Sequence, residues 1–95
     1  MHHSRQSHGI CQLDRFVYVC SGKTKNNIYT KSIERLDTAN NRWEQLADCN
    51  FESVLSLLVP LNDRYIIKLG GIRSNDIQCD SVERYDTFTD TWTVL

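Results

Sequence analysis

The fold of this 95-residue chain can be predicted from three short segments near its C-terminal end: YIIKLGG at residues 65–71, SVERYD at 81–86 and TW at 91–92. The first segment is rich in aromatic and β-branched residues, which favours a strand, and its two glycines permit the positive φ angles of a sharp turn. The other two segments have similar strand-forming residues, with polar turn residues between them. Together they predict three short consecutive strands.

The same pattern occurs earlier in the chain. Residues 14–46 align with residues 63–95 at a constant offset of 49 without a gap, and 12 of the 33 aligned positions are identical. Two unrelated segments of average composition should match at roughly 6% of positions, which is about two positions here. The chain therefore contains an internal repeat of about 50 residues, a period typical of solenoids and propellers.

The first copy alone also permits a helical interpretation, because Ile33, Leu36, Trp43 and Leu46 approximate helical spacing. The second copy argues against a helix, since residues 87–94, TFTDTWTV, are dense in residues that lose rotamer freedom in a helix. Both copies must share one fold, so we predict almost no helix and four strands per copy. The strands are expected at 6–12, 15–21, 32–37, 42–46, 54–61, 64–70, 81–86 and 91–95.

These segments resemble the Kelch repeat, whose units form the four-stranded blades of a β-propeller. The first copy supplies the counterparts FVYVCSG at 16–22, SIERLD at 32–37 and Trp43, and it departs from the pattern at Ser21 and Leu36. The resemblance implies an all-β fold with about two antiparallel blades: residues 1–48 form a degenerate first blade and residues 49–95 a second. The residues expected to be structural are Gly22, Glu34, Trp43, Gly70, Gly71, Glu83, Tyr85 and Trp92.

Two blades make an incomplete ring, because propellers close with about 4–8 blades. We therefore expect either further blades in a longer parent chain or closure by self-association, for example as a trimer of two-blade units. Trp43 and Trp92 are expected to place their rings between neighbouring sheets.

The composition excludes several classes of partner. Lys and Arg total 11 against 12 Asp and Glu, a net charge of −1, so no nucleic-acid partner is expected. The longest apolar run, residues 54–61, is too short to cross a membrane. The polar N-terminal segment lacks the apolar region of a secretory signal, which favours a cytoplasmic location and reduced cysteines.

No metal or other cofactor is expected. His2, His3, His8 and Cys11 match no metal-ligand spacing, and no two cysteines form a CxxC pair. The repeated Glu-Arg pairs at 34–35 and 83–84 could be interpreted as catalytic groups. A residue needed once in every repeat is explained more simply by structural pairing between strands or in turns.

The expected binding surface is formed by the loops at 23–31 and 72–80 together with the link at 48–52. Alternation of four strands places these segments at one end of the blades, and binding residues concentrate on loops that a rigid scaffold presents. Tyr29 and Arg73 are favoured, because Tyr and Arg dominate interface energetics. The candidate contacts are Arg5, Lys23, Lys25, Tyr29, Lys31, Arg73 and Asp76.

The resemblance implies a non-enzymatic module that binds a partner protein, as adaptors and scaffolds do. The alternative is a segment of a propeller enzyme, such as a galactose-oxidase-like oxidoreductase. That alternative would need catalytic segments and converging ligands that these 95 residues do not show.

Overall fold

The computed structural model describes residues 5, 6 and 8–95, and these residues form eight short strands and no helix. The first sheet contains β1 (Gly9–Leu13), β2 (Phe16–Cys20), β3 (Ile33–Asp37) and β4 (Arg42–Leu46). The second contains β5 (Leu57–Leu61), β6 (Tyr65–Leu69), β7 (Val82–Asp86) and β8 (Thr91–Val94). The predicted all-β fold of two four-stranded antiparallel sheets is confirmed. The described chain contains no helix that could span a bilayer.

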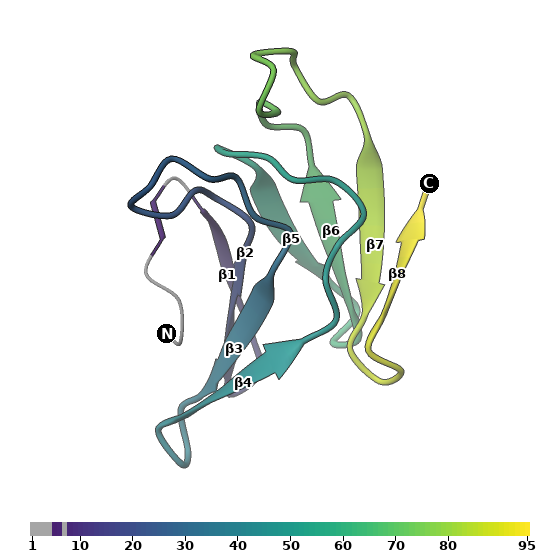
Figure 1. Cartoon of the computed structure of the whole chain (residues 1–95). Coiled ribbons are helices and arrows are strands. Elements are labelled where there is room, and N and C mark those ends of the chain that lie inside the picture. Colours follow the sequence, from purple (N-terminus) through teal and green to yellow (C-terminus); the bar gives the residue numbers. More distant parts are fainter. Residues whose placement is uncertain (1–4, 7) are drawn as a thin grey trace.

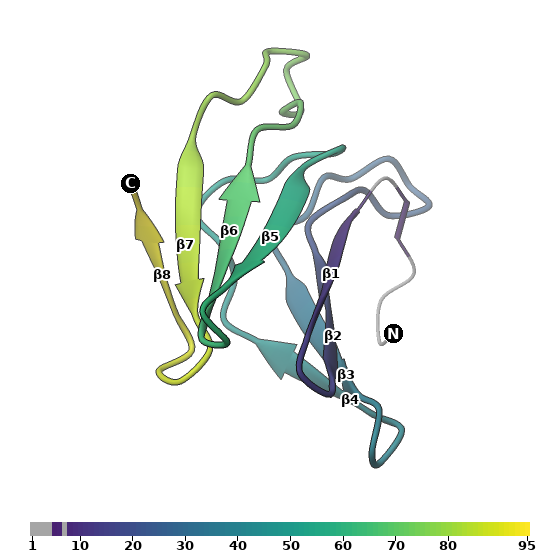
Figure 2. The same ribbon diagram turned by 180° about the vertical axis from the view of Figure 1, so that it is seen from behind.

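The two sheets lie face to face, with the strands of each in sequence order (Figure 1). Strand β1 lies against β5, as the view from behind shows (Figure 2). The β2–β3 loop, the β6–β7 loop and the link from β4 to β5 gather at one end of the sheets, and the tight hairpins lie at the other (Figure 1). This is the arrangement of adjacent propeller blades, open on both outer sides.

Two strands begin three residues later than predicted. Strand β5 was expected from residue 54 but begins at Leu57, and Val54 forms only an isolated bridge with Ile72. The reason is the left-handed conformation of Leu55, with φ 60°, which interrupts an extended strand. Strand β1 begins at Gly9 rather than at residue 6, and Gln6 likewise forms an isolated bridge, with Lys23.

Glycine is required where the second strand of each sheet ends. Gly22 and Gly71 have φ angles of 92° and 100°, and an added Cβ would lie 2.6 Å from the carbonyl oxygen of Gln6 or Val54 respectively. Both glycines therefore allow the segment that enters the sheet to pass close to the turn. The residue before each of these glycines need not be glycine. Ser21 in the first copy and Gly70 in the second occupy equivalent positions, and Ser21 adopts a φ of 59°, close to the 64° of Gly70.

The core lies between the two sheets. Tyr18 from β2 and Tyr85 from β7 are both fully buried and meet edge to face, with ring centroids 6.3 Å apart. Leu13, Ile33, Leu58 and Ile66 complete the centre of this interface. Exposed apolar residues on the outer face of β5 are Leu57, Val59 and Leu61, which leaves that side open as in an incomplete propeller.

The two tryptophans occupy different environments. Trp92 lies between the sheets as predicted: its ring centroid is 4.9 Å from that of Tyr85, and its Nε1 donates to the carbonyl oxygen of Ala47 at 3.0 Å. Trp43 is paired with Leu36 on the face of the first sheet that points away from the second sheet. Of the two tryptophans, only Trp92 therefore lies between the two sheets of this chain; that Trp43 packs between neighbouring sheets stays a prediction, because its face would meet a preceding blade.

Candidate functional site

The loop end of the two sheets contains an open cavity of about 600 Å³. Tyr29 and Lys31 line it from the β2–β3 loop, Asp48 and Glu52 from the link between the sheets, and Ser74 from the β6–β7 loop. The cavity therefore depends on both blades and on the link that joins them. We call this set of residues the rim cavity.

The two long loops are held in the same conformation. In the first, the Thr24 N–H donates to the carbonyl oxygen of Ile28 at 2.9 Å, and Asn27 has a φ of 61°. In the second, the Arg73 N–H donates to the carbonyl oxygen of Ile77 at 3.0 Å, and Asp76 has a φ of 62°. The repeat thus preserves a compact, hydrogen-bonded loop, which presents its side chains in a defined geometry.

The structure brings two of the predicted contact residues, Tyr29 and Lys31, together in the rim cavity. Lys23 lies at the base of the same loop, where its backbone bridges Gln6 and Tyr29. Lys25 and Asp76 are exposed on the two loop turns and do not line the cavity.

Arg73 braces the link as well as lying at the rim. Its Nη2 donates to Glu52 Oε1 at 3.4 Å, and its guanidinium lies 5.1 Å from the centroid of the Phe51 ring. Ser74 Oγ donates to the same carboxylate oxygen at 3.3 Å. A backbone hydrogen bond of Glu52, together with Arg73 and Ser74, lowers the pKa of this carboxyl group, so Glu52 is an ionised acceptor.

Arg5 is not a rim contact. Its guanidinium is enclosed and pairs with the equally buried Glu34 carboxylate, Nη2 to Oε2 at 2.8 Å. It also donates to the carbonyl oxygens of Ser21 and Ser32 at 3.1 and 2.8 Å. Strand alternation predicted that Arg5 lies with the rim loops, whereas the structure buries its guanidinium against the Glu34 carboxylate on β3.

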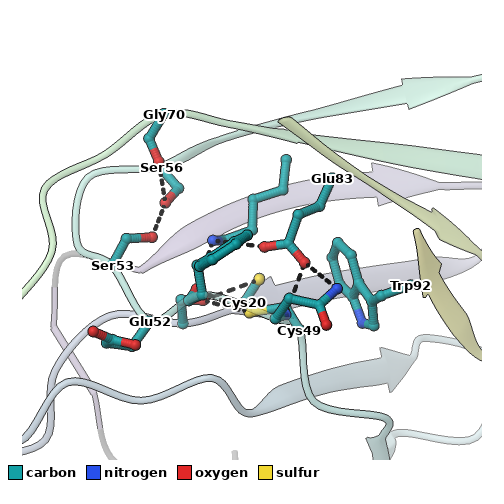
Figure 3. A network of polar contacts seen from close by, with 12 residues as sticks. Cys20, Cys49, Glu52, Ser53, Ser56, Gly70, Glu83 and Trp92 are labelled. Carbon is teal, nitrogen blue, oxygen red and sulfur yellow. Dashed lines mark hydrogen bonds and ion pairs between the residues drawn. The ribbon is translucent and has the colours of Figure 1, made fainter. Parts of the chain in front are cut away.

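The equivalent glutamate of the second sheet holds the link. Glu83 Oε1 accepts from the Asn50 N–H at 2.7 Å and from Asn50 Nδ2 at 3.0 Å, and Lys68 Nζ lies 3.5 Å from Oε2 (Figure 3). Lys68 also donates to the carbonyl oxygen of Phe51 at 2.9 Å. Lys68 and Glu83 are direct cross-strand partners. The repeated glutamate therefore has the structural pairing predicted for it, and in addition binds the segment that enters its blade.

Sequence reasoning missed a contact between two cysteines. Ser21 Oγ lies 3.3 Å from Cys20 Sγ and 3.4 Å from Cys49 Sγ, and the two buried sulfur atoms face each other beside Glu83 (Figure 3). All four cysteines are free thiols. Nothing in the sequence signals the contact, because the two residues are 29 positions apart and only the packing of the link against β2 joins them.

The expectation about metal ligands can be compared only in part with the structure, because His2 and His3 lie outside the described residues. Among residues 5, 6 and 8–95, no three potential ligands from His, Cys, Asp or Glu converge. The side chains at the rim cavity are those of a recognition surface: an aromatic ring, an ammonium group, two carboxylates and hydroxyl groups.

Comparison with known families agrees with this geometry. The family model described as Kelch motif matches residues 4–50, which span the first sheet and the start of the link. The matched copy is the one that departs more from the pattern at Ser21 and Leu36. No curated protein matches the chain.

Proposed function

Since the chain belongs to the Kelch-repeat family and its two sheets are two blades of an incomplete β-propeller, we propose that it binds a partner protein through the rim cavity. The observation that carries this proposal is the composition of the cavity, which combines Tyr29 and Lys31 of one blade with Asp48 of the link. Tyrosine offers a large contact area at low entropic cost, and the opposite charges of Lys31 and Asp48 would orient a complementary protein surface.

A binding role fits the cavity better than an enzymatic one. Glu52, a carboxylate of the cavity, is bound by Arg73 and Ser74, and its lowered pKa keeps it ionised rather than ready for proton transfer. Tyr29 and Lys31 lie on a loop with backbone hydrogen bonds that hold its shape. We therefore infer a non-enzymatic adaptor or scaffold.

The sequence and the family resemblance also support a proposal for the whole chain and its surroundings. Residues 1–48 and 49–95 are the two structural units, and they act in the cytoplasm within a ring closed by further blades or by self-association. Lys23, Lys25, Arg73 and Asp76 would surround the rim cavity as secondary contacts. Arg73 has a double role, because its loss would also release Glu52.

The experiment is affinity capture with the 95-residue chain as bait, comparing three forms of the bait by quantitative mass spectrometry. The double variant Tyr29→Ala/Lys31→Ala removes two side chains of the cavity. Its matched control, Arg42→Ala/Phe88→Ala, likewise removes one cationic and one aromatic side chain, both exposed and both at the opposite, hairpin end.

A specific partner should be retained by the parent chain and by the control, and be depleted on the order of tenfold or more by the cavity variant, as for loss of a binding hot spot. Equal recovery of every captured protein by the cavity variant and the control would show that the cavity does not bind the partner. Circular dichroism of both variants checks that the sheets are intact.

A further inference from the structure

The link between the two blades is attached to the first sheet by a pair of sulfur atoms. Cys20 is the last residue of β2. Cys49 lies on the link, two residues after Ala47, whose carbonyl oxygen accepts the hydrogen bond from the Trp92 indole. The Ser21 hydroxyl contacts both sulfurs, at 3.3 and 3.4 Å, and both cysteines are buried, with exposed fractions of 1% and 3% (Figure 3). Two thiols are thus held side by side inside the interface between the sheets.

The two thiols differ in their tendency to ionise. The hydrogen bond with the Cys20 thiol and the positive charge of Lys68 lower the pKa of Cys49 to about 7, against the effect of burial. Burial and the neighbouring Cys49 raise the pKa of Cys20. The charged groups that face the pair are Lys68 from β6 and Glu83 from β7, which pair with each other at 3.5 Å. Cys49 is therefore the thiolate of the pair, and Cys20 is its thiol donor.

We propose that Cys20 and Cys49 are a site of reversible oxidation, at which a peroxide converts the paired thiols into a disulfide that fastens the interblade link to β2. A buried site selects a small oxidant, and hydrogen peroxide is close to water in size. Bulkier disulfide reagents such as oxidised glutathione should react more slowly, because the sulfurs are enclosed.

The chemistry balances in two steps. The Cys49 thiolate attacks one oxygen of hydrogen peroxide, the O–O bond breaks, and the departing hydroxide takes a proton from Cys20 to become water. The Cys20 thiolate then attacks the sulfur of the Cys49 sulfenic acid, the S–O bond breaks, and the departing hydroxide leaves as water with a proton from the solvent. The proton taken from the solvent in the second step replaces the one that Cys49 released when it ionised. In total, two thiols and one hydrogen peroxide become one disulfide and two waters.

The disulfide would fix the part of the link that leads into the rim cavity. Cys49 is adjacent to Asp48, which lines the cavity, and to Asn50, which Glu83 binds at 2.7 Å. Closing a covalent loop over residues 20–49 restricts the unfolded chain and opposes displacement of the link. Oxidation should therefore make the link and the interface between the sheets more resistant to unfolding.

Peptide mapping tests the proposal directly, because trypsin places the four cysteines in four different peptides. Cleavage after Arg and Lys yields peptides 6–15, 16–23, 43–64 and 74–84, which contain Cys11, Cys20, Cys49 and Cys79 respectively. The full chain is treated with hydrogen peroxide at neutral pH, free thiols are then alkylated, and the linked peptides are identified by mass spectrometry without reduction. A parallel sample is oxidised in concentrated guanidinium chloride, where the fold cannot select the pair.

The expected product in buffer is peptide 16–23 linked to peptide 43–64, in excess on the order of tenfold over any other pairing, because the fold holds these thiols at high effective concentration. The excess should disappear in guanidinium. The Cys20→Ala variant should instead accumulate oxygen adducts on peptide 43–64, and the matched Cys79→Ala variant should retain the parent pattern. A different dominant pair in buffer, or the same distribution in buffer and in denaturant, would overturn the proposal.

Discussion

The indole Nε1 of Trp92 donates to the carbonyl oxygen of Ala47 at 3.0 Å, so the last strand of the second sheet binds the chain where it leaves the first. The same peptide segment is bound from its other side, because Asp90 Oδ1 accepts from the Ala47 N–H at 2.9 Å. Asp90 also accepts from the Tyr85 hydroxyl at 2.6 Å. The two blades are therefore joined by directional hydrogen bonds as well as by apolar packing.

Replacement of Trp92 by Phe should destabilise the chain by about 1–2 kcal/mol, because the ring remains aromatic while the partly buried carbonyl of Ala47 loses its donor. The measurement is urea unfolding followed by circular dichroism. Thr93→Ala on the exposed side of the same strand is the control and should change the stability by less than about 0.5 kcal/mol. Equal effects of the two substitutions would show that the indole hydrogen bond contributes nothing.

The buried pair of Arg5 and Glu34 should respond in opposite ways to single and double replacement. Arg5→Met leaves a buried carboxylate without its cation and should cost about 3–5 kcal/mol in the free energy of unfolding. Arg5→Met/Glu34→Leu removes both charges and should recover a large part of that loss. A single variant as stable as the parent chain would mean that Arg5 is exposed in solution.

Adjacent glycines of the second blade should differ in their tolerance of a side chain. At Gly71 a Cβ would lie 2.6 Å from the Val54 carbonyl oxygen, with φ at 100°, whereas at Gly70 the nearest atom is 3.6 Å away. We expect Gly71→Ala to cost about 3 kcal/mol or more and Gly70→Ser about 1 kcal/mol, since Ser21 already adopts the second conformation. Chemical denaturation of both variants measures the difference, and equal losses would contradict the close approach of Val54.

The two-sheet architecture could be predicted from the sequence, because local residue patterns determine it. The offset of 49 residues located equivalent strands, and Thr87–Val94 excluded the helix suggested by the first copy. Tyr29 and Lys31 were also placed near the link correctly, since strand alternation determines which loops share an end.

The remaining features depend on contacts between distant segments. The burial of Arg5 follows from Glu34, 29 residues away, and no local pattern distinguishes Arg5 from an exposed arginine. The position of Trp43 depends on which face of its sheet has a neighbour, and repeat symmetry makes it look identical to Trp92. The contact between Cys20 and Cys49 likewise arises only when the link folds over β2.

The carboxyl group of Asp86 should titrate far below its ordinary range. Arg64 donates to both of its oxygens, at 3.1 and 2.8 Å, and these bonds are the largest cause that lowers the Asp86 pKa to about 2. Because the folded-state pKa lies below the unfolded value of about 4, the stabilising effect is present above pH 4 and is lost as the pH falls through 2. NMR titration of the side-chain carboxyl carbon measures the value.

Arg64→Met should raise the Asp86 pKa towards 4. The matched control is Arg15→Met in the first sheet, where Arg15 pairs with Asp37 at 3.3 Å, and it should leave the Asp86 pKa unchanged. A titration midpoint of Asp86 near 4 in the parent chain would show that the ion pair does not form in solution.

The packing of one blade on the next is tested most directly by nuclear Overhauser measurements on the isotopically labelled chain. The structure predicts cross-peaks from the Trp92 indole N–H to Ala47 and from the ring protons of Tyr18 to those of Tyr85, together with slow exchange of the indole proton with solvent. Absence of these cross-peaks in a chain that retains its strand signals, with rapid exchange of the indole proton, would contradict the proposed interface between the two blades.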